Sequence, residues 1–246
     1  MFDFRSTKTI ELTTCTPIDK DKGVYSFTES VTGKYYVLKV FEVKNFNDYQ
    51  IVEFRKLALL SAEPEIATVY GLVSVQDGEN TFIGYIMEYI DGDTLENVLK
   101  PDVFISLNYY NSVLEQLAKG MEKAHYFGVI HGDLKWHNVM IDAFGNVKII
   151  DFFWADNGAT AADDIENYKE IAFILYNKLS TSNQKHADVI HQFIQSITIF
   201  KDADSYIASL QEISFELGFL SPKGKLLLSY LIHNEESELN RATKSM

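Results

Sequence analysis

Residues 131–138 are the part of the sequence that most restricts its fold, and they read His-Gly-Asp-Leu-Lys-Trp-His-Asn. Two short apolar runs follow, at 139–141 and 147–150, separated by the turn-forming sequence Asp-Ala-Phe-Gly. This pattern predicts a β-hairpin. The hairpin would bring Asn138, before its first strand, close to Asp151, after its second strand.

The side chains at the open end of this hairpin indicate a type of chemistry. Asn138 and Asp151 offer hard oxygen atoms of the kind that magnesium prefers. Asp133 and Lys135 lie on the loop that leads into the hairpin and add a carboxylate and a cation. Together these groups suit phosphoryl transfer from Mg-ATP. An ordinary acidic hairpin on the surface is the alternative interpretation.

Composition restricts the class of protein. The 246 residues allow one large domain or two small lobes, and a hydrophobic content of 46% is enough for a sizeable core. The lone Cys15 excludes an intrachain disulfide and a cysteine metal cluster. A net charge of −13 argues against nucleic-acid binding, although a local cationic site for ATP is compatible with it. We find no membrane span or signal pattern and expect a cytoplasmic protein.

Hydrophobic periodicity predicts strands in the first third of the chain and helices in the rest. The predicted strands lie at about 9–14, 24–28, 34–41, 69–75 and 81–89. The predicted helices lie at about 47–62, 94–99, 108–127, 163–180, 184–199, 203–217 and 222–234. This order favours an α+β fold with two lobes.

Two charged residues stand where apolar ones are expected. Lys39 lies on the same strand face as Val37 and Phe41, because side chains two positions apart point to the same side. Glu53 lies on the same face of its helix as Leu57. Because buried charges are rare unless they are paired, we predict an ion pair between Lys39 and Glu53. Two unrelated exposed charges are the alternative.

The segments taken in order resemble the protein kinase superfamily over about residues 18–180. The matching segments are Leu38-Lys39, the helix with Glu53, 64–71, 86–95, 117–125, 128–135 and 145–152. The resemblance implies a single kinase-like domain over 1–246. Residues 1–89 would form an N-lobe of antiparallel β-sheet with one helix, and residues 90–246 a mostly helical C-lobe with a short activation segment.

The family's roles can be transferred residue by residue. The resemblance implies that Asp133 accepts or orients the proton of the acceptor hydroxyl. It also implies that Lys135 stabilises the transferring phosphoryl group and favours a serine or threonine acceptor. Asn138 and Asp151 would hold Mg²⁺. The resemblance also implies that Lys39, held by Glu53, binds the phosphates of ATP. The backbones of Glu88 and Ile90 would contact adenine. The residues implied around the nucleotide are Val24, Val37, Met87, Glu88, Ile90 and Met140.

Several positions depart from the family pattern. The phosphate-loop segment 17–24 has one glycine, Gly23, and side-chain cations from Lys20 or Lys22 are possible substitutes. Gly132 replaces the arginine that usually pairs with a phosphorylated activation loop, which predicts activity without that phosphorylation. Phe153 replaces a glycine, and the activation segment before about Asp163 is short and lacks Ala-Pro-Glu.

Three functions remain open at this point. A serine/threonine protein kinase with a protein substrate is favoured by the retained charged residues. The His-Gly-Asp sequence and the short segment also resemble small-molecule kinases that act on sugars, lipopolysaccharide cores or aminoglycosides. A kinase-like binding module with little catalysis is the third possibility. Minimal kinases that some bacteria deliver into host cells have a similarly compact design.

Overall fold

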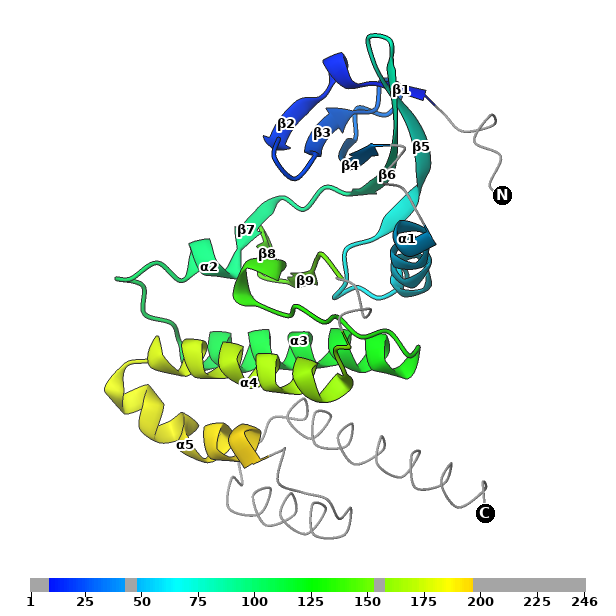
Figure 1. The fold of residues 1–246 in the computed structure, drawn as a ribbon. Helices are drawn as coiled ribbons and strands as arrows, with labels where there is room; N and C mark the ends of the chain where they lie inside the picture. Colours follow the sequence, from blue (N-terminus) through cyan, green and yellow to red (C-terminus); the bar gives the residue numbers. More distant parts are fainter. Residues whose placement is uncertain (1–8, 43–47, 153–157, 197–246) are drawn as a thin grey trace, which may run out of the picture. The chain divides into compact units, whose positions relative to one another are not determined.

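The computed structural model describes residues 9–42, 48–152 and 158–196, shown in colour in Figure 1. The described residues form two compact units. The first unit holds the residues up to Val98 together with Gly120–Thr160, and the second holds Leu99–Lys119 and the residues from Ala161 onward. The predicted helices at 203–217 and 222–234 lie outside the described residues. The division into lobes at residue 89 stays a prediction.

A six-stranded sheet dominates the first unit, in the order β1-β5-β6-β4-β3-β2 (Figure 1). Its strands are β1 (Thr9–Glu11), β2 (Thr16–Asp19), β3 (Val24–Thr28), β4 (Tyr35–Glu42), β5 (Val69–Asp77) and β6 (Asn80–Glu88). Neighbouring strands are antiparallel except that β1 runs parallel to β5. The predicted antiparallel sheet is therefore confirmed, with one parallel pair added at its β1 edge.

The predicted strand at 9–14 is shorter than expected because a 3₁₀ turn at Leu12–Thr14 ends it. The Thr14 hydroxyl donates to the Glu11 carbonyl at 2.7 Å, and the Cys15 amide donates to the Leu12 carbonyl at 3.0 Å. Threonine side chains form such local bonds in competition with a strand ladder. The chain then continues into β2, which was not expected.

Alternation along β4 divides its side chains between two environments. Leu38 is fully buried on one face, where it packs in a cluster with Ile10, Val73 and Val75. Lys39 belongs to the other face, near the ring of Tyr85, which is also buried. Helix α1 (Asp48–Leu60) reaches this ring through Phe54, with the ring centroids 6.4 Å apart. The apolar alternation predicted for this strand is confirmed.

A three-stranded sheet also belongs to the first unit, in the order β7-β8-β9. Its strands are β7 (Gly92–Thr94), β8 (Val139–Asp142) and β9 (Val147–Ile149). The predicted hairpin is therefore confirmed as β8–β9. The segment expected to be only a connector before the short helix α2 (Leu95–Val98) instead forms β7.

Hydrogen bonds connect this second sheet to the segment that precedes β5. The Ile149 amide donates to the Glu65 carbonyl at 2.8 Å, and the Ala67 amide donates to the Ile149 carbonyl at 3.0 Å. A parallel bridge between Ile66 and Ile149 completes the pattern. Strand β9 is thus fixed to the same unit as the six-stranded sheet.

Helices make up the second unit. They are the first part of α3 (Leu107–Tyr126), α4 (Ala161–Asn177) and α5 (Thr181–Ser196). Leu114 and Leu117 of α3 and Leu175 of α4 are buried, as their helical spacing predicts. The Tyr168 hydroxyl also donates to the Leu114 carbonyl at 3.2 Å. Strands in the first unit, with helices in both units, give the predicted α+β class. In the part of the chain that the structure describes, no helix combines the length and apolar character needed to cross a bilayer.

Candidate active site

The open end of the β8–β9 hairpin brings Asn138 and Asp151 together, as the sequence predicts. Val139 pairs with Ile149, and one step further the Ile150 amide donates to the Asn138 carbonyl at 3.0 Å. The buried Asn138 side chain donates through Nδ2 to the Asp133 carbonyl at 2.9 Å. Because Nδ2 makes this bond, the amide oxygen is the atom left to serve as a ligand.

His131 anchors the loop that leads into the hairpin. Its ring is fully buried and contacts the Phe152 ring at a tilt of 39°, with the ring centroids 4.6 Å apart. Nδ1 accepts a hydrogen bond from the Asp133 amide at 3.2 Å, and Nε2 lies 3.1 Å from the Ile150 carbonyl oxygen. Nδ1 is therefore the acceptor and Nε2 the donor, which describes a neutral imidazole. His131 is absent from the predicted site residues, although its place at the start of the motif was a usable signal.

Asp133 and Lys135 form an ion pair at the end of this loop. Lys135 Nζ lies 2.5 Å from Asp133 Oδ1, and the two side chains are 50% and 35% exposed. The Asp133 backbone is fixed on both sides of the residue, because its amide bonds to His131 and its carbonyl to Asn138. An accessible carboxylate on a fixed backbone is suited to a proton acceptor.

Lys39 donates a hydrogen bond to Asp151, with Nζ 2.7 Å from Oδ1. The lysine side chain is only 16% exposed, and Nζ lies 5.8 Å and 5.9 Å from the ring centroids of Phe41 and Tyr85. Glu53 belongs to α1, but its side chain lies outside the described residues, so its predicted pairing with Lys39 stays a prediction.

Electrostatics keep the Asp151 carboxyl ionised. Burial raises its pKa, but the charge and hydrogen bond of Lys39 outweigh this effect, with a smaller contribution from the charge of Lys22. The pKa of Asp151 therefore lies below its ordinary value. Its φ of 57° is the only positive value at a non-glycine position among the described residues. Aspartate tolerates this left-handed region, and backbone strain of this kind concentrates at functional sites.

Comparison with known proteins agrees with this geometry. The family model for the protein kinase domain matches residues 22–172, which is more than half of the chain. This chain belongs to the protein kinase family. The match includes Lys39, Asp133, Asn138 and Asp151.

Individual relatives match about half of the chain. Serine/threonine-protein kinase PrkC of Bacillus subtilis is 29% identical over 135 residues, covering 53% of this chain and 20% of that protein. Serine/threonine-protein kinase PknA of Mycobacterium tuberculosis is 32% identical over 134 residues, covering 52% of this chain and 31% of that protein. Serine/threonine-protein kinase RIM15 of Saccharomyces cerevisiae is 29% identical over 143 residues, covering 55% of this chain and 8% of that protein. The chain thus spans less than a third of the length of each of these kinases.

The expected adenine contacts lie along neighbouring strands. Val37 pairs with Met87 across β4 and β6, and Val24 of β3 pairs with Lys39. Met140 lies on β8, and Ile90 lies between β6 and β7. Nucleotide binding by these residues is a proposal.

The Glu88 side chain, at the end of β6, makes two contacts that were not predicted from the sequence. Its amide donates to the Thr68 carbonyl at 2.8 Å, so this amide is bonded within the first unit. Its carboxylate oxygen Oε2 accepts from Lys148 Nζ at 2.9 Å and from the Thr68 amide at 3.1 Å. Lys148 is a charged residue within an apolar strand, which is the same signal that singled out Lys39.

Proposed function

We propose that this protein is a Mg-ATP-dependent phosphotransferase, of the serine/threonine protein kinase type. The observation that carries the proposal is the clustering of two charged pairs at one hairpin end. These are Lys39 with Asp151 and Lys135 with Asp133. The relatives named above are serine/threonine-protein kinases, which supports a protein hydroxyl as the acceptor.

The side chains at the site fit magnesium and ATP by their chemistry. Asn138 contributes an amide oxygen and Asp151 a carboxylate held ionised by its surroundings, both of which are hard ligands suited to Mg²⁺. Lys39 is a cation suited to phosphate oxygens. Bound Mg-ATP would supply the phosphoryl group and part of the positive charge that its transfer requires.

Each residue of the loop then has a role. The Asp133 carboxylate would accept the proton of the acceptor hydroxyl. Lys135 would neutralise negative charge on the transferring group. His131 and Asn138 would hold the Asp133 backbone in place, so that the carboxylate needs no rearrangement before it acts.

We also propose that the loop is active without phosphorylation of an activation segment. Gly132, which stands where the family often has arginine, has a φ of 77°, in the region that favours glycine. The neighbouring Asp133 backbone is held by His131 and Asn138, both within the same hairpin region. No phosphate–arginine contact is needed to build this arrangement.

A small-molecule kinase is the second candidate. It is favoured by the position of α4, which begins at Ala161, shortly after Asp151. The chain between them lacks the Ala-Pro-Glu sequence and leaves little length for a peptide-docking platform. The acceptor would then be the hydroxyl of a sugar or a related molecule.

Transfer of radiolabelled phosphate from Mg-ATP tests the proposal. The wild type would be compared with Asp133→Asn, and with Asp77→Asn as a control for an exposed carboxylate in the same unit. The acceptors would be whole-cell lysate proteins, the protein itself and a panel of sugars. We expect label on proteins, its loss by at least about a hundredfold in Asp133→Asn, and wild-type transfer in the control. Label on sugars alone would favour the second candidate. Nucleotide binding without transfer to any acceptor would indicate a binding module and contradict both.

A further inference from the structure

The turn between β2 and β3 occupies the place of the family's glycine-rich phosphate loop, but it uses its backbone amides differently. The Lys22 amide donates to the Asp19 side chain at 3.1 Å, and the Gly23 amide donates to the Lys20 carbonyl at 3.2 Å. Two amides that a phosphate loop would direct at a ligand are therefore bonded within the turn.

Gly23 is required by packing against the next strand. A Cβ atom at this position would lie 2.6 Å from the Val40 carbonyl oxygen, and its φ is 68°. The Val40 amide also donates to the Gly23 carbonyl at 2.8 Å. The one glycine of the segment thus attaches the turn to β4, which is a structural reason for its presence.

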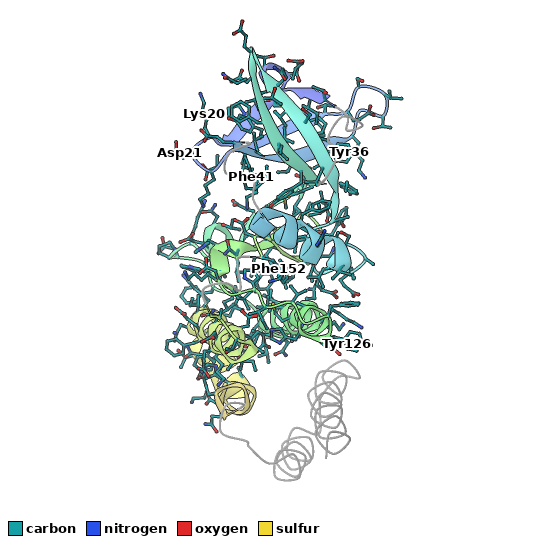
Figure 2. All side chains as sticks on the ribbon, turned by 45° about the vertical axis from the view of Figure 1, so that its right-hand side comes forward. Lys20, Asp21, Tyr36, Phe41, Tyr126 and Phe152 are labelled. Carbon is teal, nitrogen blue, oxygen red and sulfur yellow. The ribbon has the colours of Figure 1, made fainter. Side chains whose placement is uncertain are left out.

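Strand pairing places Lys22 two residues before the position opposite Lys39, which is proposed to bind ATP. Val24 pairs with Lys39, so the turn lies next to the strand that carries this lysine. The charge of Lys22 also acts on the Asp151 carboxylate, whereas Lys20 is not among the groups whose charge lowers the pKa of that carboxylate. Figure 2 shows Lys20 and Asp21 at the edge of the six-stranded sheet.

Lys22 is also able to move toward a ligand. Its side chain is 71% exposed, and its ammonium lies 3.8 Å from Asp19, in an exposed ion pair. Exposed pairs of this kind contribute little free energy. Exchanging Asp19 for a phosphate group would therefore cost little, while a phosphate carries more charge and more acceptor oxygens.

We propose that the Lys22 side chain binds the phosphate groups of ATP, in place of the backbone amides of a glycine-rich loop. This inference rests on the proposed function, because it concerns the same nucleotide. It makes a prediction specific to phosphate: removing the ammonium should weaken ATP binding and leave adenosine binding unchanged.

Equilibrium binding of Mg-ATP, Mg-ADP and adenosine tests the inference without requiring phosphate transfer. Lys22→Ala and Lys22→Gln would be compared with Lys20→Ala, which removes the same charge from the same turn, and thermal unfolding would check that each variant folds. We expect both Lys22 variants to bind Mg-ATP about tenfold more weakly and adenosine as tightly as the wild type does. Lys20→Ala should match the wild type with every ligand.

Three results would overturn the inference. The first is unchanged Mg-ATP affinity in both Lys22 variants, and the second is an equal loss for Mg-ATP and adenosine. The third is a loss in Lys20→Ala that equals the loss in Lys22→Ala. A wild-type protein that binds no nucleotide would instead refute the proposed function itself. The two failures are therefore distinguishable.

Discussion

The ion pair between Glu88 and Lys148 leads to a quantitative prediction about stability. It joins the last residue of β6 to the middle of β9, and Nζ lies 2.9 Å from Oε2. The same carboxylate oxygen accepts from the Thr68 amide at 3.1 Å. The pair thus connects the strand expected to contact adenine with the hairpin that carries Asp151, so its removal should loosen both.

Burial sets the size of the effect. The side chains of Lys148 and Glu88 are 14% and 24% exposed, so water screens their interaction only partly. Fully exposed pairs contribute about 0.2–1 kcal/mol, whereas hydrogen bonds to charged groups contribute about 1.5–3 kcal/mol. We therefore expect Glu88→Gln and Lys148→Met each to lower the free energy of unfolding by about 1–2 kcal/mol. The double variant should lose about 1 kcal/mol less free energy of unfolding than the two single variants lose together, because the second change removes a charge that already lacks its partner.

Urea denaturation of the wild type, the two single variants and the double variant measures this coupling. The control is Glu115 and Lys119 on α3, a pair 3.2 Å apart in which the lysine is 44% exposed and the glutamate 16% exposed. Its coupling should be about 0.3–0.5 kcal/mol. Additive losses at Glu88 and Lys148, or a coupling no larger than in the control, would refute the reasoning from burial. A loss of 1 kcal/mol should appear as a fall in Tm of about 2–4 °C.

Three further changes should alter stability measurably. A Cβ on Gly92 would lie 2.1 Å from a backbone oxygen of β8, so Gly92→Ala should lower Tm by several degrees, whereas Gly71→Ala, which meets nothing within 4 Å, should leave it nearly unchanged. Equal Tm values for the two would refute this. Asp142→Ala removes acceptors for the Phe144 and Asn146 amides, each at 2.8 Å, and should cost about 1–3 kcal/mol in urea denaturation; a loss under 0.5 kcal/mol would contradict the role of this turn. Since the folded-state pKa of Asp151 is lowered, the stabilisation from its ionised form should be complete above the ordinary aspartate pKa of about 3.9 and disappear as the pH falls below it. The difference in unfolding free energy between the wild type and Asp151→Asn should shrink over that range, and a difference independent of pH would rule the effect out.

Local patterns were enough to predict much of the fold. The β8–β9 hairpin followed from two apolar runs around a turn sequence, and α1 and α3 followed from helical spacing. What the pattern could not predict depends on distant residues. Strand β7 exists because Gly92–Thr94 pairs with β8, which lies more than forty residues further along the chain. Nothing in a three-residue segment indicates such a pairing.

The ends of elements were also hard to predict where side chains compete with the backbone. The alternation of residues 9–14 fits a strand throughout, yet Thr14 bonds to the Glu11 carbonyl and turns the chain after three strand residues. Threonine favours strands by its shape and also forms local hydrogen bonds, so the sequence is compatible with both outcomes.

For the charged residues of the site, the local strand pattern identifies the lysine but not its distant acidic partner. A lysine within an apolar strand indicates a partly buried cation, and such a cation needs an acidic partner. This reasoning identified Lys39 and applies equally to Lys148. It does not identify the partner, because the chain holds 35 acidic residues and the partners observed are Asp151 and Glu88, 112 and 60 residues away. Both lysines thus pair with carboxylates at the ends of strands that they do not belong to. A change to either lysine should therefore alter the position of a strand end as well as the local charge, which is why both stability and ATP affinity need to be measured for the same variants.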